Sequence, residues 1–323
     1  MIFFSDQTSP GKIHEYGTGK SSKMSQQYDV LVLTESRYIS PENRDVYIDN
    51  VLLEDRLVVE ALRAEGLSVD RVDWADPRID WSSTSAVLFR TTWDYFERYE
   101  QFQSWMNQLP GNVSMINPES IIRWNIDKHY LLDLAARGIN IPPTIILEAG
   151  DSRSLKDLQE ETGWEDMILK PCISGGARNT FRLSASNLHH YEARYNQLID
   201  NESFMIQPFQ HSVLSDGELS LMVFGETYTH AVQKIAKPGD FRVQDDWGGT
   251  VHPYTPSAEE IQVALDATSA VSPLPAYARV DMIRDNEGQL SIMELELLEP
   301  ELWFRFYPDA AGVFAKTIVK NWL

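Results

Sequence analysis

Apolar and polar residues alternate along the first third of the chain in a pattern of strands followed by helices. Short apolar runs at Asp29–Leu33, Val69–Val72 and Ala86–Phe89 are typical of buried strands. Apolar residues recur with helical spacing over Ile48–Glu65 and Phe96–Leu109. This alternation predicts an α/β domain whose parallel strands are joined by right-handed crossovers. No GxGxxG sequence follows the first strand, which argues against a dinucleotide site there.

The middle of the chain changes to short strands and helices around a loop of small residues. A helix through Leu134 ends at Gly138, and the pair Pro142-Pro143 marks a boundary. The loop Ser174–Ala177 separates two strand patterns, so we expect a compact α+β subdomain. Its predicted strands are Ile145–Leu147, Met167–Lys170, Asn179–Leu183 and Phe204–Pro208, and its predicted helices are Ser154–Thr162 and Asn187–Asp200.

The last third of the chain is predicted to be mainly antiparallel. Strand patterns at Leu219–Phe224 and Thr227–Gln233 flank Gly225-Glu226, which indicates a hairpin with a type II′ turn. The polar stretch 234–249 is too long for an ordinary connection, which suggests a functional loop. Helices are predicted over Ala258–Val271 and Asp309–Trp322.

A second predicted hairpin, near the C-terminus, concentrates charge on one face. Side chains alternate between faces along a strand, so Arg279 and Asp281 share one face of its first strand. Glu294 and Glu296 likewise share one face of its second strand. A turn centred on Glu287-Gly288 places Asp281 opposite Glu294. The same turn places Arg279 opposite Glu296, unless a bulge shifts the register by one residue.

This charged patch of three carboxylates and one guanidinium leaves two interpretations open. Like charges opposite each other destabilise a sheet, and carboxylates that share a site hold a proton or bind a cation. The patch is therefore either a solvated acidic face or a site for a divalent cation. The other face of the hairpin is apolar, which indicates that the hairpin lies on a core.

Composition places the chain among ordinary globular proteins. Its 323 residues can bury a large core and allow two or three domains. Hydrophobic residues make up 43% and charged residues 24%, as in typical soluble domains. Residues 1–27 are polar and lack periodicity, so we expect a disordered tail there.

The overall charge is strongly acidic, with 28 Lys and Arg against 48 Asp and Glu and a formal net charge of −20. This charge argues against binding to nucleic acid or to an anionic membrane, but a local basic cluster can still hold a phosphorylated ligand. No apolar run approaches the length of a membrane span or a secretory signal. The single cysteine, Cys172, permits no intramolecular disulfide, so we expect a cytoplasmic protein.

Polar and aromatic residues follow the predicted strand that ends at Phe89. Ligands of open α/β sheets bind outside the carboxyl ends of the strands, so Arg90 there could clamp a substrate carboxylate. The alternative is a surface pair between Arg90 and Asp94, with Trp93 packed in the core. The residues in this position are Arg90, Thr91, Trp93, Asp94 and Tyr95.

Several other residues have ordinary explanations when they are considered singly. Lys128 would be a solvated lysine, and the loop Ser174–Ala177 after Lys170 a simple turn, although its glycines also allow backbone N–H groups to approach phosphate. No GKS or GKT follows these glycines, so the loop is not a Walker A loop. The remaining residues are Gln207 and Phe209 at a strand end, Glu218 as a surface acid, and His230 and Lys234 on the polar face of a strand.

Taken together and in chain order, these pieces resemble the ATP-grasp superfamily, and most closely its glutathione synthetase/RimK-like branch. The resemblance covers roughly residues 28–323. It rests on Lys128 before Pro142-Pro-Thr144, on Ile168-Leu-Lys170 before Ser174-Gly-Gly176, on Gln207-Pro-Phe209 before Gly217-Glu-Leu-Ser220, and on Arg279-Val-Asp281 before Glu294 and Glu296.

The resemblance implies an ATP-grasp fold of mixed α/β and α+β class. We expect a disordered tail at 1–27 and a Rossmann-like N-terminal domain with a parallel sheet at 28–124. A lid subdomain at 125–208 and an antiparallel C-terminal catalytic subdomain at 209–323 would follow.

The resemblance also implies which residues bind ATP and metal. The phosphates would be held by Lys128 and Lys170 and covered by a lid at Ser174, Gly175 and Gly176. Gln207 and Phe209 would offer backbone contacts to adenine, and Glu218 would lie near the ribose. Two Mg²⁺ ions, which Mn²⁺ can replace, would be held by Asp281, Glu294 and Glu296.

Catalytic and substrate roles follow from the same resemblance. Arg279 would stabilise an acyl-phosphate intermediate, while Lys234 and Arg242 would hold the γ-phosphate or a substrate carboxylate. The substrate contacts would be Arg90, Thr91, Trp93, Asp94 and His230. Many relatives carry Asn at the position of Glu296, so the geometry of the second ion is open.

The activity implied is ATP-dependent, ADP-forming ligation of a carboxylate to an amine through an acyl phosphate. The substrates would be small amino-acid-like molecules or peptides, and a homodimer is the oligomeric state expected by default. The segments Arg90–Tyr95 and Lys237–Gly249 look similar to the cyclo-ligases that close O-ureidoserine to cycloserine, so intramolecular closure is an alternative. A non-catalytic ATP-binding regulatory protein is a further alternative.

Overall fold

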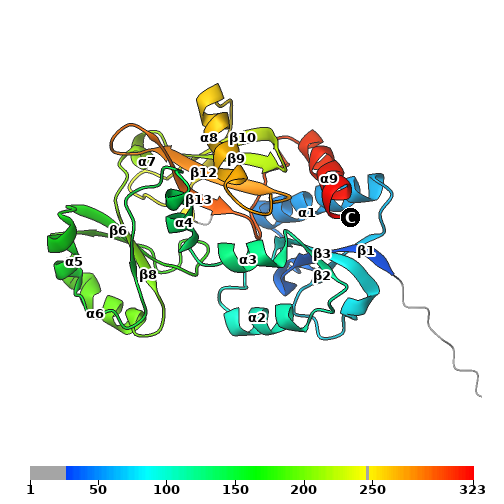
Figure 1. Ribbon diagram of the computed structural model, residues 1–323, viewed down its shortest axis with the longest axis horizontal. Coiled ribbons are helices and arrows are strands. Elements are labelled where there is room, and N and C mark those ends of the chain that lie inside the picture. Colours follow the sequence, from blue (N-terminus) through cyan, green and yellow to red (C-terminus); the bar gives the residue numbers. More distant parts are fainter. Residues whose placement is uncertain (1–26, 245–246) are drawn as a thin grey trace, which may run out of the picture.

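The computed structural model describes residues 27–244 and 247–323, and Figure 1 shows their arrangement in three lobes. Each lobe is built on one sheet, and the fold has the predicted mixed α/β and α+β class, with one parallel and two antiparallel sheets. The predicted tail lies outside the described residues, apart from residue 27. Among the described residues, no helix combines the length and the apolar character needed to cross a membrane.

The N-terminal lobe contains the parallel sheet that the alternating pattern predicts. Its elements are β1 (Tyr28–Thr34), α1 (Val46–Ala64), β2 (Val69–Asp73), β3 (Thr84–Thr91), α2 (Tyr99–Gln108) and β4 (Ser114–Ile116), with 3₁₀ turns at Ser36–Tyr38 and Trp81–Ser83. The strand order is β2-β1-β3-β4. Asp45 caps α1 by accepting a hydrogen bond from the backbone N–H of Ile48 at 2.8 Å. The helix then buries Val58 and Leu62 against the sheet.

The middle lobe carries a four-stranded antiparallel sheet in the order β5-β8-β6-β7. Its elements are β5 (Ile145–Leu147), α5 (Leu155–Thr162), β6 (Asp166–Pro171), β7 (Phe181–Ser184), α6 (Leu188–Ile199) and β8 (Phe204–Pro208). Ser154 and Asp157 form a capping box at the start of α5, and Gly163 ends this helix with φ at +70°. In Figure 1 this lobe projects away from the N-terminal sheet.

The C-terminal lobe carries a five-stranded antiparallel sheet in the order β11-β10-β9-β12-β13. Its elements are α7 (Ser212–Ser215), β9 (Glu218–Phe224), β10 (Thr227–Ile235), β11 (Thr250–Tyr254), α8 (Ala258–Ser269), β12 (Ala278–Arg284), β13 (Leu290–Glu296) and α9 (Asp309–Trp322). The helix α9 lies beside α1, and one apolar core joins this lobe to the N-terminal lobe. Two short helices, α3 (Glu119–Asn125) and α4 (Tyr130–Ala136), connect the N-terminal and middle lobes, and α4 packs on the core below the five-stranded sheet.

The charged hairpin has the predicted register. Arg279 pairs with Glu296, and Asp281 pairs with Glu294. The turn itself is centred one half-residue earlier than predicted, since Arg284 pairs with Leu290. A bulge after Asp281 restores the offset, so the two differences cancel at the charged positions.

Some elements differ from the sequence-based expectation. The short strands β4 and β11 were not predicted, because three to five residues give too little periodicity. The helix α2 begins at Tyr99 rather than Phe96, because residues 93–98 form turns. The closing helix spans Asp309–Trp322 as predicted.

Candidate active site

A cavity of about 800 Å³ lies where the three lobes meet. The charged hairpin lines one side, the middle lobe contributes β6 and the loop after it, and the N-terminal lobe contributes the segment after β3. The cavity therefore brings together residues that are far apart in the sequence. The predicted site residues on its wall are Trp93, Asp94, Lys128, Lys170, Ser174, Gly175, Gly176, Gln207, Phe209, Glu218, Lys234, Arg242, Arg279, Asp281, Glu294 and Glu296.

Side chains from α3 and α4, which connect the N-terminal and middle lobes, bind the backbone of β13, the outer strand of the hairpin. Asn125 donates to the carbonyl of Leu295 at 2.7 Å and accepts from the N–H of Leu297 at 2.8 Å. The Tyr130 hydroxyl accepts from the N–H of Leu295 at 2.9 Å. These bonds satisfy an otherwise unpaired strand edge and fix the segment that carries Lys128 against the hairpin.

Asp281 is the centre of the charge network on the hairpin. Arg279 binds its carboxylate through two nitrogens, with Nη2 2.8 Å from Oδ2. The Nζ of Lys234 lies 3.1 Å from the same oxygen, and the Ser220 hydroxyl donates to Oδ1 at 2.6 Å. Burial opposes ionisation, but Arg279 and Lys234 outweigh it and hold the pKa of Asp281 below its ordinary value.

The two lysines predicted to hold phosphate have different surroundings. The Nζ of Lys128 lies 3.1 Å from the Glu294 carboxylate and donates to the carbonyl of Ser174 at 2.8 Å. Among the described residues, Lys170 is in no ion pair. Burial lowers the pKa of Lys170, and the charge of Glu294 offsets only part of this effect. A cation held in this way is well placed to receive an anionic ligand.

The remaining carboxyl groups ionise less readily than usual, because they are buried beside other carboxylates. Burial raises the pKa of Glu296 to about 8, and repulsion from Glu294 and Asp281 adds to an effect that its ion pair with Arg279 only partly opposes. Burial also raises the pKa of Glu299 to about 7. Such a set of hard oxygen donors fits a divalent cation, which would offset their negative charge. Each predicted metal ligand is paired with a basic side chain, so these pairs must rearrange when a cation binds.

The small-residue loop after β6 touches two other parts of the molecule. A side-chain carbon added to Gly175 would lie 2.7 Å from the ring of Phe96, so the glycine allows the loop to approach the N-terminal lobe closely. The indole N–H of Trp247 donates to the carbonyl of Gly176 at 3.2 Å. Arg242 stacks over the Trp247 ring at 3.5 Å and binds Asp240 at 2.7 Å. The predicted functional loop therefore packs against the predicted lid.

The backbone of Phe209 does not fit its predicted contact with adenine. Its N–H donates to the carbonyl of Asp166 at 2.8 Å, and its carbonyl accepts from Asn286 at 2.9 Å. Phe209 belongs to the cavity wall but is 2% exposed, and the guanidinium carbon of Arg182 lies 3.7 Å from the centre of its ring.

Arg90 and Thr91 lie behind the cavity and do not fit direct contact with a substrate. Arg90 is 1% exposed, lies 3.0 Å from Glu54 and donates to the carbonyl of Pro300 at 2.8 Å. The hydroxyl of Thr91 donates to Asp55 at 2.9 Å. The alternative pair between Arg90 and Asp94 is also absent from the described contacts, because Asp94 binds Arg98. Arg90 instead ties the N-terminal lobe to the segment after the hairpin.

His230 is likewise buried rather than exposed to the cavity. It shares a sheet face with Lys234, as predicted, but the segment 302–307 covers its end of that face. Its Nε2 lies 2.6 Å from the carbonyl of Leu302, and burial lowers its pKa to about 4. The expected contact between His230 and a substrate therefore does not fit the structure.

Sequence reasoning missed two cavity residues that follow the hairpin. The centre of the Trp303 ring lies 5.1 Å from the guanidinium carbon of Arg279 and 5.8 Å from the Nζ of Lys234. One indole therefore stabilises both cations through cation–π contacts. Glu299 adds a further carboxylate to the wall, and its carbonyl accepts from the Trp93 indole at 2.9 Å. The sequence gives an indication of both residues, because acidic and aromatic residues are concentrated directly after Glu296.

Comparison with known proteins identifies two matching families along the chain. The model of the D-cycloserine synthetase DcsG N-terminal domain matches residues 30–117. The model of the RimK-like ATP-grasp domain matches residues 135–298, which is half of the chain. The two matches together span the three lobes.

Individual relatives agree with these matches. The chain is 31% identical to the cycloserine biosynthesis protein DcsG of Streptomyces lavendulae, over 82% of this chain and 92% of that protein. It is 26% identical to a probable alpha-L-glutamate ligase of Sodalis glossinidius, over 76% of this chain and 86% of that protein. The crystal structure of D-cycloserine synthetase DcsG superimposes with a TM-score of 0.78 and 26% identity, covering 90% of this chain and 99% of that chain.

Proposed function

Because the chain belongs to the RimK-like ATP-grasp ligases, we propose that it activates a small amino-acid-like or peptide carboxylate and joins it to a nitrogen nucleophile. Ligases of this family are ATP-dependent and form ADP, and they use Mg²⁺. The observation that carries the proposal is a cavity in which Lys128 and Lys170 face the carboxylates of the hairpin. A site of this kind combines cations for phosphate with hard oxygen ligands for metal.

The proposed reaction has two steps, a phosphoryl transfer and an acyl transfer. In the first step, a carboxylate oxygen of the substrate attacks the γ-phosphorus of ATP, the bond to the β–γ bridging oxygen breaks, and ADP leaves. In the second step, the nitrogen attacks the acyl carbon, inorganic phosphate leaves, and the nitrogen releases a proton. The carboxylate is a poor acyl donor until it is phosphorylated, which explains the need for ATP.

Basic side chains of the cavity would offset the charge on the transferring phosphoryl group. Lys128 and Lys170 would hold the ATP phosphates from the side of the middle lobe. Arg279, supported by Trp303, would stabilise the acyl phosphate, and Lys234 would hold the γ-phosphate or the substrate carboxylate. Lys128, Lys234 and Arg279 would be freed from their carboxylate partners if those carboxylates held a metal ion, whereas Lys170 has no such partner among the described residues.

The metal ligands in this proposal are Asp281, Glu294 and Glu296. Two Mg²⁺ ions, replaceable by Mn²⁺, would supply Lewis acidity and offset phosphate charge. The lid at Ser174–Gly176, with the loop that carries Arg242 and Trp247, would limit the access of water to the acyl phosphate.

A second candidate function is intramolecular closure of a cycloserine-type ring. It is favoured by the match of residues 30–117 to the DcsG N-terminal domain. It is also favoured by the 31% identity to DcsG of Streptomyces lavendulae, in an alignment that covers 92% of that protein. The first step would be the same, but the nucleophilic nitrogen would belong to the activated molecule itself. The test substrate for this candidate is O-ureidoserine.

Release of ADP tests the proposal directly. The protein is incubated with Mg²⁺, ATP and panels of amino acids, hydroxy acids and O-ureidoserine, and ADP is followed with a coupled assay while mass spectrometry identifies the product. We expect ADP release with a matching carboxylate and a product with a new carbon–nitrogen bond. Failure of every carboxylate to release ADP would favour the non-catalytic alternative.

A matched pair of variants tests the metal-binding face. We expect Glu294→Gln to abolish turnover at every Mg²⁺ concentration while its circular dichroism spectrum shows that the protein is still folded. The control, Glu287→Gln, removes an equal charge from the exposed turn of the same hairpin and should retain activity. Full activity of Glu294→Gln would contradict the assignment of metal ligands.

Oligomeric state and compartment are separate proposals. We propose a homodimer, because closed two-fold assemblies are the commonest among soluble enzymes. We also propose the cytoplasm, where a single cysteine without a disulfide partner is ordinary. Light scattering coupled to size exclusion would measure the mass, and a monomeric mass at micromolar concentration would contradict the dimer.

A further inference from the structure

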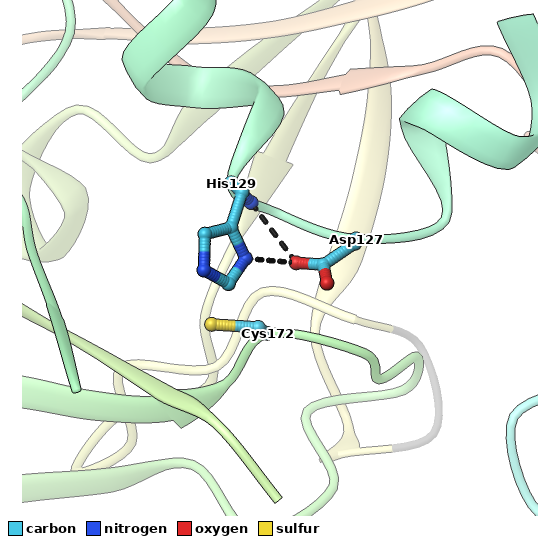
Figure 2. Close-up of side chains that lie close together, drawn as sticks. All are labelled: Asp127, His129 and Cys172. Atoms are coloured by element: carbon cyan, nitrogen blue, oxygen red, sulfur yellow. Dashed lines mark hydrogen bonds and ion pairs between the residues drawn. The ribbon is translucent and has the colours of Figure 1, made fainter. Parts of the chain in front are cut away.

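Three potential metal ligands that do not line the cavity lie close to one another. Asp127 follows α3, His129 precedes α4, and Cys172 follows β6 (Figure 2). One ligand atom from each of these residues lies within 4.8 Å of the other two. A tetrahedral Zn²⁺ site requires such atoms to be about 3.3–3.6 Å apart, as follows from its bond lengths. Small side-chain rotations would therefore bring them into position.

The three side chains offer a combination of donors that is selective for particular metals. A thiolate, an imidazole and a carboxylate together suit Zn²⁺ and similar borderline cations, whereas Mg²⁺ prefers oxygen alone. None of the three residues lines the ATP cavity. The cluster is therefore chemically and spatially distinct from the carboxylates of the hairpin.

The cysteine supplies the observation that separates a metal site from a hydrogen-bonded pair. Its side chain is 1% exposed, and its thiol has no hydrogen-bond partner among the described residues. Figure 2 shows the sulfur next to the imidazole of His129. A buried polar atom without a partner, directed at a histidine and a carboxylate, has a suitable role as a metal ligand.

The surroundings of His129 also match those of a metal-bound histidine. Its Nδ1 contacts Asp127, and its Nε2 lies 3.1 Å from the carboxylate of Glu148. Glu148 in turn accepts a hydrogen bond from Ser203 at 2.8 Å. With a cation on the Nδ1 side, Nε2–H would continue to donate to Glu148, which is the usual outer partner of a ligating imidazole.

An ordinary interpretation needs no metal. A protonated His129 would bridge Asp127 and Glu148, and Cys172 would act as a small apolar side chain in the core. This interpretation accounts for the two carboxylates but leaves the thiol without a polar partner. The two interpretations predict opposite results when a thiophilic metal is offered to the protein.

We propose that Asp127, His129 and Cys172 form a binding site for Zn²⁺, with the fourth position taken by water. The site is built from the two chain segments that carry Lys128 and Lys170. The backbone N–H of Lys128 donates to the carbonyl of Cys172 at 2.9 Å, so the segments are already joined at this point. A bound cation would link them a second time, next to the predicted phosphate contacts.

Titration with Co²⁺ in excess Mg²⁺ tests this site on the full-length, reduced, tag-free protein. Because Cys172 is the single cysteine of the chain, a cobalt–thiolate charge-transfer band in the near ultraviolet identifies this site without ambiguity. We expect a band that saturates at one equivalent of Co²⁺ and disappears when one equivalent of Zn²⁺ is added. Absence of the band would overturn the proposal.

Variants assign the ligands. Cys172→Ser should lose the band, and His129→Gln should weaken Co²⁺ binding at least tenfold. His252→Gln, which removes an exposed histidine from β11, should bind as the wild type does. If Cys172→Ser fails to fold by circular dichroism, Cys172→Ala replaces it. A rise in melting temperature with Zn²⁺ in the wild type but not in His129→Gln would support the site independently, and equal rises in both would contradict it.

Discussion

At the scale of single residues, the cavity is organised by cations that already have carboxylate partners. Arg279 binds both Asp281 and Glu296, and Lys234 binds Asp281 and, at 2.5 Å, Glu218. A buried pair of this kind is held by mutual attraction that offsets a large desolvation cost. Removing one member leaves the other charge buried alone, so substitutions at Arg279 or Asp281 test stability as much as catalysis.

Lys170 offers a cleaner test of the phosphate site, because it is in no ion pair among the described residues. We expect Lys170→Met to lower kcat/KM for ATP roughly 30-fold, which corresponds to the loss of about 2 kcal/mol from one charge-assisted contact. Steady-state kinetics at varied ATP would measure this loss. Lys156→Met is the control, since Lys156 is exposed on α5 and pairs with Glu160. An unchanged KM and kcat in Lys170→Met would contradict its role.

His230 determines a pH dependence of stability rather than of catalysis. Burial among the rings of Phe224, Phe304 and Tyr307 lowers its pKa from 6.5 to about 4. The unfolded chain therefore binds a proton that the folded chain does not between these pH values. The stability that neutral His230 provides is complete above pH 6.5, is lost as pH falls towards 4, and amounts to about 3 kcal/mol.

His230→Gln should flatten this dependence. The amide stays neutral, so the free energy of unfolding should lose a slope of up to about 1.4 kcal/mol per pH unit between pH 6 and 4.5. Urea unfolding at pH 7, 5.5 and 4.5 measures the slope. The exposed histidine of β11 gives the matched control His252→Gln, which should keep the slope of the wild type. Equal slopes in all three proteins would contradict the prediction.

The hairpin residues that sequence reasoning placed correctly are fixed by local periodicity. The faces of the hairpin follow from strand alternation, so the positions of Asp281 and Glu294 could be predicted. Arg90 and His230 could not be placed, because the segment 300–307 covers them from a distant part of the chain. Burial by a non-local segment leaves no trace in the periodicity of the strand that it covers.

At the scale of elements, the start of β9 depends on a glycine. Gly217 has φ at +71°, and a side-chain carbon there would overlap the carbonyl oxygen of Lys234 on β10. The close approach of these backbones sets the distance between Glu218 and Lys234, whose side chains pair in the cavity. Gly288, in the hairpin turn, has φ at +82° but no atom within 4 Å of an added carbon.

Alanine substitutions at these two glycines distinguish the cost of conformational strain from the cost of steric overlap. Gly288→Ala should lower the free energy of unfolding by about 1 kcal/mol, the cost of a left-handed conformation alone. Gly217→Ala should cost about 1–3 kcal/mol more, because the strands must also move apart. It should also reduce turnover, whereas Gly288→Ala should not. Urea midpoints and ADP release measure the two effects, and equal costs for both variants would contradict the proposed overlap.

At the scale of the whole molecule, the cavity is enclosed by parts of all three lobes. The loop after β6 packs on Phe96 of the N-terminal lobe through Gly175 and on Trp247 of the C-terminal lobe through Gly176. Sequence patterns predicted the loop and the long polar stretch separately. Their contact could not be predicted, because 71 residues separate Gly176 from Trp247 and no periodicity relates them.

Trp247→Phe tests whether this contact protects the reaction from water. The variant keeps a ring for Arg242 to stack on but loses the hydrogen bond to Gly176. Such a bond is worth about 1 kcal/mol, so its loss should lower the equilibrium constant for docking the two loops roughly fivefold. We expect phosphate release without a nitrogen nucleophile to rise by about that factor, because the acyl phosphate meets water more often. Trp124→Phe is the control, since it loses an indole hydrogen bond to Asp133 outside the cavity. If both variants release phosphate at the wild-type rate, exclusion of water from the cavity does not depend on this contact.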